Sequence, residues 1–375
     1  MQILHVTEAS WAGTLQVVRG LAAHQAANGH AVTLAYADRP VTPADLAELA
    51  TGGVELVPLH WTRRSPRAQI AVGRVLRRLV RERRPDVVHL HSSFAGAVGA
   101  LALPRGVPLI YTPHGLAFAR KGVARPAAAA ARAVEALVAR RSALLGAVSE
   151  AEAELARRGL HAPRVAVARN GIPELDGDRS GAAPERAEPV VVAMGRVTAA
   201  RQPAATARIL SALARDARVS WIGGGGEDDA PVREAGIPVT GWLPRAEALE
   251  RLGEATVYLH WSAWDGQSLA LLEAFARDVV VVASDIAANR EVVGPRQICA
   301  DEAAAIALAR SILASPELRD ELLADQRSRG AAFGAARAGA EWLALYEQVL
   351  DRPAVARMQP ATAAAAGRKI GGPWN

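Results

Sequence analysis

Cysteine and lysine are almost absent from this sequence of 375 residues. The single cysteine, Cys299, excludes an intrachain disulfide and any zinc site built from two or four cysteines, and it suits a reducing compartment. The only lysines are Lys121 and Lys369. A P-loop requires Gly-Lys-Ser or Gly-Lys-Thr, which the chain lacks, and a pyridoxal enzyme requires a lysine in a suitable setting for a Schiff base. The composition therefore argues against both enzyme classes.

Long apolar runs are missing as well. The longest uncharged stretch, residues 87–104, contains two histidines and two serines and is shorter than the ~20 apolar residues of a membrane-spanning helix. A strand-like run follows Met1 directly, without a basic segment, so we expect no signal peptide. These features predict a cytoplasmic protein.

The residues that are present predict two α/β domains. Apolar residues make up 50% of the chain and charged residues 22%, which is enough to bury a core in each of two medium-sized domains. Strand-like runs alternate with segments of helical periodicity, a βαβ rhythm typical of parallel sheets covered by helices. We predict two doubly wound, Rossmann-like domains that face each other across a cleft. The expected bounds are 1–173 for the first domain, 174–189 for a linker, 190–350 for the second domain and 351–375 for a disordered tail.

The sequence also predicts where the individual elements lie. Strands are expected at residues 2–7, 31–36, 86–91, 108–112, 142–148 and 164–168, and in the second half at 190–194, 218–222, 239–240, 256–260 and 279–283. The last helical pattern covers residues 319–350, and this helix is a candidate to pack back on the first domain.

The basic charge is concentrated in the first half of the chain. Residues 1–175 hold 22 basic and 12 acidic residues, whereas the remainder holds 22 and 26. Residues 63–84 and 120–141 are rich in arginine, and both segments read as amphipathic helices. They are either solvated helix faces or a patch that meets anionic lipid headgroups. Nucleic acid is not expected as a partner, because no aromatic residues are interleaved for base stacking.

The most informative motif is Asp-Gly-Gln-Ser-Leu at residues 265–269, followed by Glu273. A strand is expected to run into this loop, and a helix is expected to begin near Ser268, where free backbone amides can bind a phosphate. Two carboxylates beside such a site are poor phosphate ligands but good acceptors for sugar hydroxyls. The plainer interpretation is a helix-capping acid and a buried helix acid.

This segment resembles the carboxylate-x₇-carboxylate motif of retaining GT-B glycosyltransferases of family 4, with aspartate in place of the usual first glutamate. The resemblance extends along roughly residues 1–350. It implies that Asp265 contacts the donor sugar as a catalytic residue and that Glu273 binds the ribose. The donor diphosphate would lie on the loop and the helix amides, that is, on Gly266, Gln267, Ser268 and Leu269.

Two arginines and one histidine extend the resemblance. Arg196 and Arg201 follow a strand and resemble the family's Arg and Lys, which hold the diphosphate. His114, in Tyr-Thr-Pro-His-Gly, maps onto a catalytic histidine that faces the transferred sugar. His91 and Ser92 would shape the acceptor side. Lone histidines and surface arginines are more often structural, and the neighbouring motifs favour the functional interpretation.

Glycine loops complete the predicted site. Gly13 lies between the first strand and a helix, in a loop that is not a Gly-x-Gly-x-x-Gly fingerprint, so a dinucleotide oxidoreductase is not indicated. The loop resembles the family's first glycine loop, which implies that backbone amides at Gly13 approach the donor diphosphate or the acceptor. Gly241 and Trp242 resemble the segment that holds the nucleotide base. The only Asp-x-Asp sequence lies in the expected linker and reads as turn chemistry, and no metal site or cofactor is expected.

The resemblance predicts a metal-independent retaining glycosyltransferase of the hexosyltransferase type. Its donor would be a nucleoside-diphosphate sugar, most plausibly UDP-linked, and its acceptor a glycan or a polyprenyl-diphosphate-linked sugar of capsule or exopolysaccharide assembly, with peripheral contact to the inner face of the plasma membrane. Two alternatives stay open at this point: a nucleotide-sugar epimerase of the same fold, and a non-catalytic nucleotide-sugar-binding subunit.

Overall fold

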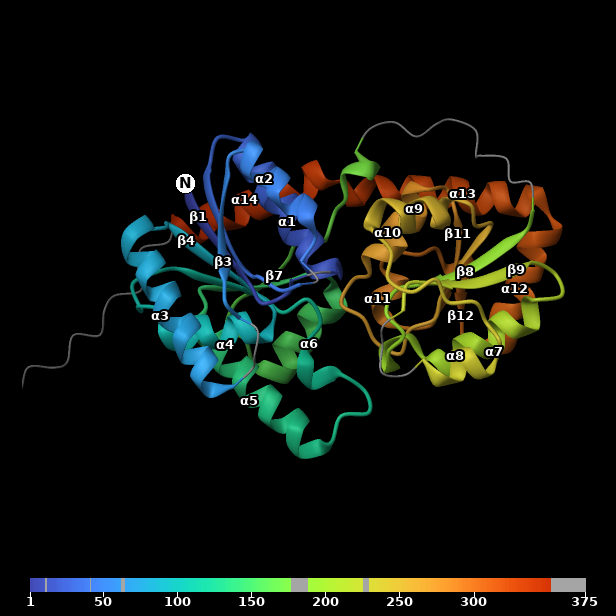
Figure 1. Ribbon diagram of the computed structural model, residues 1–375, viewed down its shortest axis with the longest axis horizontal. Helices are drawn as coiled ribbons and strands as arrows, with labels where there is room; N and C mark the ends of the chain where they lie inside the picture. The colour runs from blue at the N-terminus through green and yellow to red at the C-terminus, as the bar shows by residue number, and fades with distance from the viewer. Residues whose placement is uncertain (11, 41, 62–64, 177–187, 225–228, 352–375) are drawn as a thin grey trace, which may run out of the picture.

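The computed structural model describes residues 1–10, 12–40, 42–61, 65–176, 188–224 and 229–351, and it has two halves, each built around a parallel sheet (Figure 1). This architecture confirms the predicted fold class. Most of the predicted linker, and the predicted tail beyond Asp351, lie outside the described residues.

The first sheet has seven strands in the order β3-β2-β1-β4-β5-β6-β7, and every neighbouring pair is parallel. The strands are β1 (Gln2–Thr7), β2 (Ala31–Ala37), β3 (Val54–Leu59), β4 (Val87–His91), β5 (Leu109–Thr112), β6 (Leu144–Ala147) and β7 (Val165–Val167). The helical elements are α1 (Ala12–Ala27), η1 (Ala44–Ala47), α2 (Glu48–Thr51), α3 (Pro66–Arg83), α4 (Ser93–Ala102), η2 (Ala117–Ala119), α5 (Arg125–Arg141), α6 (Glu150–Leu160) and η3 (Pro173–Leu175).

Alternation along the strands sends side chains to two covered faces. Leu4 and Val88 pack with residues of α3, α4, α5 and α6, whereas Ile3 and Val87 pack with α1 and α14 (Ala335–Leu350). The period of two in a strand places His5 on the same face as Ile3, so a polar residue enters a face that is otherwise apolar.

The second sheet has five parallel strands in the order β12-β11-β10-β8-β9. They are β8 (Val190–Met194), β9 (Arg218–Ile222), β10 (Val257–His260), β11 (Val280–Ser284) and β12 (Ile298–Cys299). The helical elements are η4 (Ala199–Arg201), α7 (Pro203–Leu213), α8 (Ala230–Glu234), α9 (Arg245–Gly253), α10 (Leu269–Ala276), α11 (Ala287–Arg290), η5 (Pro295–Gln297), α12 (Glu302–Ala314), α13 (Pro316–Gly330) and η6 (Ala331–Phe333). Helices α9 and α10 pack on one face, and α7, α8 and α12 pack on the other.

Four elements differ from the sequence predictions. Strands β3 and β12 were not predicted, and the segment expected as a strand at 239–240 forms only an isolated bridge between Val239 and Trp221. The helix expected over 319–350 is divided into α13 and α14 by η6. This interruption lets the chain cross between the halves, where Ile172 pairs with Gly334.

The C-terminal helix lies on the first domain. In Figure 1, α14 runs in red beside β4 and the blue strand β1, and its Trp342 and Tyr346 pack with Ile3 and Val87. Among the described helices, none is both long and apolar enough to span a bilayer.

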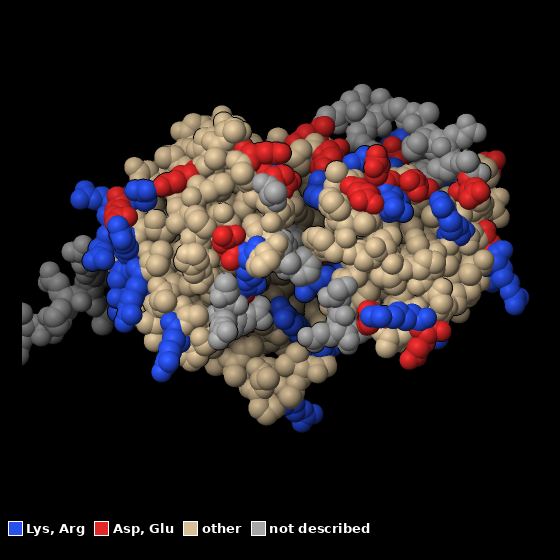
Figure 2. Space-filling view, viewed as in Figure 1, with Lys and Arg blue, Asp and Glu red and all other residues tan. Residues whose placement is uncertain are grey.

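The strand orders locate the ligand sites that the fold can offer. The order reverses direction between β1 and β4 in the first sheet and between β8 and β10 in the second. Ligands of open α/β sheets bind beyond the carboxyl ends of strands at such switch points. The loops after these strands hold most of the predicted site residues, and Figure 2 shows a hollow with basic side chains between the two halves.

Candidate active site

Arg201 is the centre of a polar cluster at the carboxyl end of the second sheet. Its Nη1 donates to Asp265 Oδ2 at 2.8 Å and to Ser262 Oγ at 2.5 Å, and its Nη2 donates to Ser268 Oγ at 3.2 Å. Burial is the largest influence on the pKa of Arg201 and lowers it, but the charges of Asp265 and Tyr258 and the hydrogen bond to Asp265 together raise that pKa above its ordinary value. The guanidinium is therefore fixed and charged directly beside the start of α10.

A second cationic group comes from both domains. Burial lowers the pKa of Arg196, and the charges of Arg120 and Arg201 lower it further. Arg120 follows η2 in the first domain, whereas the other two arginines follow β8 in the second. Since Arg120 and Arg201 destabilise the charge of Arg196, an anion bound beside Arg196 would stabilise it.

The loop after β5 carries His114 toward the second domain. His114 has φ 52° and Gly115 has φ 102°, so the chain turns sharply here. A Cβ atom on Gly266 would lie 3.1 Å from the backbone N of Gly115, which shows how closely the two loops approach. The structure therefore brings His114 and the 265–269 motif together across the domain boundary.

Glu152 on α6 holds the backbone of this loop through hydrogen bonds. Its carboxylate accepts hydrogen bonds from the backbone N–H of Gly115 at 2.5 Å and of Val148 at 2.9 Å. Burial raises the pKa of Glu152 to about 7, although both hydrogen bonds act in the opposite direction. Glu135 on α5 accepts from the N–H of Ala117 at 3.0 Å, so two buried acids hold the backbone that follows β5.

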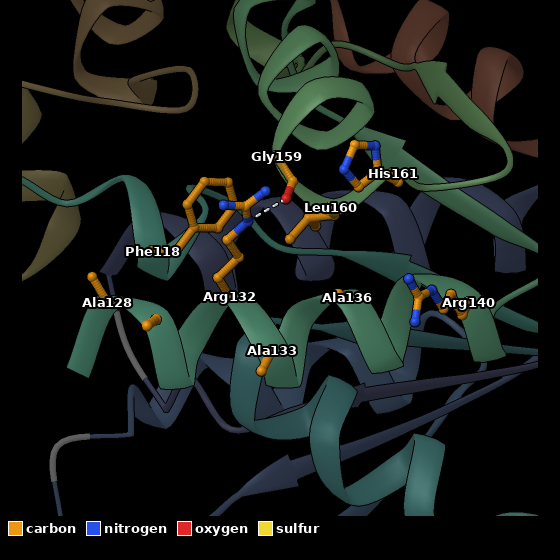
Figure 3. A pocket seen from close by; sticks show the side chains of 10 residues that line it. Phe118, Ala128, Arg132, Ala133, Ala136, Arg140, Gly159, Leu160 and His161 are labelled. Atoms are coloured by element: carbon orange, nitrogen blue, oxygen red, sulfur yellow. Dashed lines mark hydrogen bonds between the residues drawn. The ribbon is translucent and has the colours of Figure 1, made fainter. Parts of the chain in front are cut away.

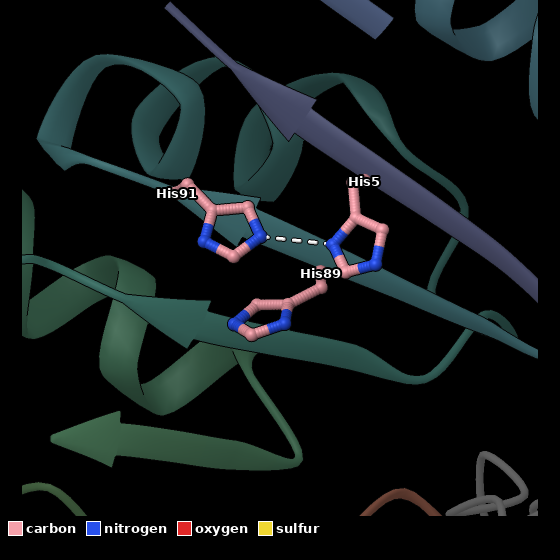
Figure 4. Close-up of side chains that lie close together, drawn as sticks. All are labelled: His5, His89 and His91. Carbon is pink, nitrogen blue, oxygen red and sulfur yellow. Dashed lines mark hydrogen bonds between the residues drawn. The ribbon is translucent and has the colours of Figure 1, made fainter. Parts of the chain in front are cut away.

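His114 belongs to a group of four histidines, the histidine cluster, in which His5, His89 and His91 are buried and His114 is partly buried. Figure 4 shows three of them, with His5 on β1 and with His89 and His91 on β4. His91, predicted for the acceptor side, is buried and bonds His5 and His114 through its two ring nitrogens, so it lies behind His114.

His5, His89 and His91 lie close enough to hold a metal, with ligand atoms within 4.8 Å of one another. All six of their ring nitrogens have hydrogen-bond partners, however, so we do not assign a metal there. His5 bonds Gln25 and His91, His89 bonds Thr112 and Tyr346, and His91 bonds His5 and His114.

Ser92, also predicted for the acceptor side, directly follows β4. It has φ 77°, and its hydroxyl is buried without a hydrogen-bond partner. Its side chain therefore does not lie on an open surface.

Glu273 on α10 is held by an arginine that the sequence did not point to. Arg245, at the start of α9, donates to Glu273 Oε1 at 3.0 Å and to Glu174 Oε1 at 3.1 Å. Burial raises the pKa of Glu273, and the charge of Arg245 opposes that rise. The carboxylate is thus oriented in advance, with Arg245 as its support.

The remaining predicted residues of the 265–269 motif lie where the domains touch. A Cβ atom on Gly13 would lie 3.8 Å from Leu269 Cδ1. The side chain of Gln267 points away from the helix start, and its Oε1 accepts from the backbone N–H of Asn170 at 2.6 Å. The side chain of Gln267 thus joins the 265–269 loop to Asn170 of the first domain, whereas its Nε2 is buried without a hydrogen-bond partner.

The predicted base-binding segment lies beside β9. Gly223 pairs with Gly241 in an isolated bridge, and the Thr240 hydroxyl accepts from the N–H of Gly223 at 2.9 Å. Gly223 has φ 109°, and a Cβ atom there would lie 2.6 Å from Gly195 O, so a side chain would not fit. Trp242, the other residue of this segment, is 57% exposed. The next two glycines of the sequence, at positions 225 and 226, lie outside the described residues.

A separate groove of about 560 Å³ lies on the first domain, between α5 and the end of α6 (Figure 3). Phe118, Leu160 and Arg132 line it, and Arg132 Nε donates to Gly159 O at 2.6 Å. None of the predicted site residues lines this groove.

Sequence reasoning missed Arg245, Arg120, Glu152 and the path through His5. For Arg245 and Arg120 the sequence holds no specific signal, because arginine is common throughout the chain. Glu152 follows Ser149, a helix cap, and reads as an ordinary acid of a first helical turn. His5 could have been found, since His5, His89 and His91 occupy alternate positions of strands that would otherwise be apolar.

Comparisons with known proteins agree with this arrangement. Residues 11–174 match the family model described as Glycosyltransferase Family 4, and residues 188–315 match the one described as Glycosyl transferases group 1. The chain is a GT-B glycosyltransferase. The first match covers most of the half built on the seven-stranded sheet, and the second covers much of the half built on the five-stranded sheet. Both matches favour an enzyme over the non-catalytic binding subunit.

Solved structures similar to the enzyme show the same fold. A sucrose-phosphate synthase from Thermosynechococcus elongatus has 17% identity and a TM-score of 0.77, with 93% of this chain and 99% of that chain covered. HepE from Anabaena in complex with UDP and glucose has 15% identity and a TM-score of 0.72, with 93% and 100% covered. The catalytic domain of starch synthase IV from Arabidopsis thaliana, bound to ADP and acarbose, has 13% identity and a TM-score of 0.68, with 94% and 100% covered. Among curated proteins, none matches the chain.

Proposed function

We propose that this enzyme is a retaining glycosyltransferase that moves a hexose from a UDP-sugar to a glycan or polyprenyl-diphosphate-linked acceptor of surface polysaccharide biosynthesis. The observation that carries the proposal is the meeting of Arg201, Asp265 and the start of α10 with the His114 loop of the other domain. HepE, a similar structure, was solved with UDP-glucose as well as with UDP, which supports a nucleotide-sugar donor.

The diphosphate would lie between the arginines and the amides at the start of α10. Arg196 and Arg201 are positively charged, Arg201 is held by its bond to Asp265, and the N-terminal amides of a helix add partial positive charge. These groups stabilise the negative charge that develops as the bond between the sugar carbon and the phosphate oxygen breaks. In this proposal the donor is a substrate, and neither metal nor cofactor is needed, because the arginines and helix amides supply the charge stabilisation.

The rest of the donor would extend to both sides of the diphosphate. Glu273, oriented by Arg245, would accept hydrogen bonds from the ribose hydroxyls, and the segment at Gly241 and Trp242 would hold the base. The sugar would lie toward His114 and Asp265. The acceptor oxygen would then form its bond to the sugar carbon on the face from which the diphosphate leaves, which retains the configuration.

Contact with an anionic membrane forms part of this proposal. Helices α3, α4 and α5 expose large apolar side chains among arginines, and these include Leu101 at 73% exposure and Leu137 at 50%. Apolar and basic side chains on one set of helices suit the boundary between lipid headgroups and acyl chains. Arg120, from the second basic segment, affects the pKa of Arg196 and so belongs to the cleft.

The test is turnover of nucleotide sugars by the purified full chain. We expect release of UDP from one UDP-sugar without acceptor, faster release with a polyprenyl-diphosphate-linked acceptor, and a product with the anomeric configuration of the donor, as read by NMR. An epimerised sugar released without acceptor would instead identify the epimerase of the same fold. Preference for an ADP- or GDP-sugar would refute the UDP assignment.

A further inference from the structure

A row of hydrogen-bonded side chains leads from Gln25 on α1 to His114. Gln25 Oε1 lies 2.7 Å from His5 Nε2, His5 Nδ1 lies 2.9 Å from His91 Nε2, and His91 Nδ1 lies 3.0 Å from His114 Nε2. Figure 4 shows the central bond of this row, from His91 on β4 to His5 on β1. The row joins the interior of the first domain to the loop that faces the second.

All three histidines in the row are neutral near pH 7. Burial lowers the pKa of His5 and of His114 to about 4 and holds the pKa of His91 well below its usual value. A neutral imidazole has one N–H donor and one acceptor nitrogen. In a row of such rings, the direction of one hydrogen bond therefore fixes the direction of the next.

The carbonyl oxygen of Gln25 fixes the direction of the whole row. Because this oxygen can only accept, His5 Nε2 carries a proton and His5 Nδ1 accepts from His91 Nε2–H. His91 Nδ1 then accepts from His114 Nε2–H. Nδ1 of His114 is left as an acceptor.

We propose that Gln25, His5 and His91 are positioning residues that hold His114 in the Nε2–H form, with Nδ1 ready to accept a hydrogen bond from a hydroxyl of the bound sugar. This inference rests on the proposed function, in which His114 faces the donor sugar. Without the row, either nitrogen of His114 can carry the proton, and only one of the two forms accepts at Nδ1.

A matched control is offered by the hydrogen bonds of His89, which belongs to the cluster but not to the row. Its ring centroid lies 3.9 Å from that of His91, but its nitrogens bond Thr112 Oγ1 at 2.8 Å and Tyr346 Oη at 2.6 Å, outside the row. Thr112→Val removes a buried hydrogen bond from the same cluster and leaves the row intact. Gln25→Met removes the terminal acceptor with little change of volume, and Gln25→Glu keeps an acceptor oxygen in its place.

The first measurement is NMR of the full chain labelled with ¹⁵N at histidine, in which the two ring nitrogens report the tautomer. The His114 signals are assigned by their loss in His114→Asn. We expect His114 in the Nε2–H form in the wild type, in Gln25→Glu and in Thr112→Val, and a mixture of both forms in Gln25→Met. Gln25→Leu replaces Gln25→Met if that variant does not fold, which circular dichroism checks.

The second measurement is UDP-sugar turnover, with UDP affinity determined by calorimetry. Gln25→Met should lower kcat about tenfold with unchanged UDP affinity, whereas Gln25→Glu and Thr112→Val should stay near the wild-type kcat. The inference is overturned if wild-type His114 is in the Nδ1–H form, or if Gln25→Met changes tautomer and kcat no more than Thr112→Val does. Failure of the proposed function would give a different result. The wild type would then neither bind UDP nor turn over a UDP-sugar, whereas the tautomer of His114 seen by NMR would be unaffected.

Discussion

Replacement of Arg201 by alanine is the most direct test of the diphosphate site. The guanidinium of Arg201 donates hydrogen bonds to Asp265, Ser262 and Ser268, so its removal takes the central donor group out of this loop. A charge-assisted hydrogen bond contributes about 1.5–3 kcal/mol. At about 1.4 kcal/mol for each factor of ten, UDP affinity should fall by roughly 10- to 150-fold.

Arg201→Ala should also lower the stability of the second domain, because Asp265 keeps its charge without its partner. Breaking a fully buried ion pair costs about 3–5 kcal/mol. The side chains of Arg201 and Asp265 are 21% and 19% exposed, so the cost should be smaller than that. Asp265→Asn in the same chain should restore part of the stability but none of the UDP affinity.

The single variant Asp265→Asn should bind UDP about as well as the wild type, because Asp265 is proposed to contact the sugar and UDP lacks it, while Asn can still accept a hydrogen bond from Arg201. Its kcat should fall if Asp265 contacts the sugar. Calorimetry with UDP and denaturant unfolding measure both effects, and Arg208→Ala, which removes an exposed ion pair with Glu302 on α12, is the control. Wild-type UDP affinity in Arg201→Ala would place the diphosphate elsewhere.

Three further predictions follow from other parts of the molecule. Glu273→Gln should weaken UDP and UDP-sugar binding equally, because it acts on the ribose; calorimetry that finds only the sugar nucleotide affected would contradict this. Leu137→Asp should reduce flotation with anionic vesicles and leave UDP affinity unchanged. If the wild type bound neutral and anionic vesicles equally well, the proposed attraction between the arginines and anionic lipid would be refuted. The histidine cluster should make the first domain unstable in acid. Folding lowers the pKa of each of the four histidines, so below about pH 6.5 the unfolded chain binds protons that the folded domain does not. The free energy of unfolding should therefore be unaffected above about pH 6.5 and should fall toward pH 4 by up to ~1.4 kcal/mol per pH unit for each histidine. The raised pKa of Glu152 acts in the opposite direction below about pH 7, and denaturant unfolding at several pH values measures the sum.

The sequence predicted most of the sheet because buried parallel strands are short apolar runs between breakers. It did not predict β3, which contains Pro58 and lies at the edge of the sheet, where proline is tolerated. It also joined α13 and α14 into one helix, since the segment between them shows no proline. The interruption there is set by tertiary contact, because Gly334 packs against Ile172 and Asp176 at the crossing between domains.

The site was predictable to the extent that its residues follow strands. Arg201, Asp265 and His114 each follow a strand of a parallel sheet, and the carboxyl ends of such strands share one edge. The partners that orient them come from distant positions. Arg245 is 28 residues from Glu273 along the chain, and Gly115 is 37 from Glu152. Nothing local to these partners marks them, so only the folded chain reveals them.

Backbone strain is present in several loops of the candidate site. Ser92, His114 and Gln202 have φ values of 77°, 52° and 45°, and each lies at a strand end or in a loop beside the cleft. Such conformations cost a non-glycine residue about 1–3 kcal/mol and persist only where surrounding contacts hold them. For His114 those contacts are its ring bond to His91 and the hydrogen bond from Gly115 to the Glu152 carboxylate. The strain at His114 and the buried groups that hold it are therefore parts of one arrangement, in which ring and backbone are fixed before a donor binds.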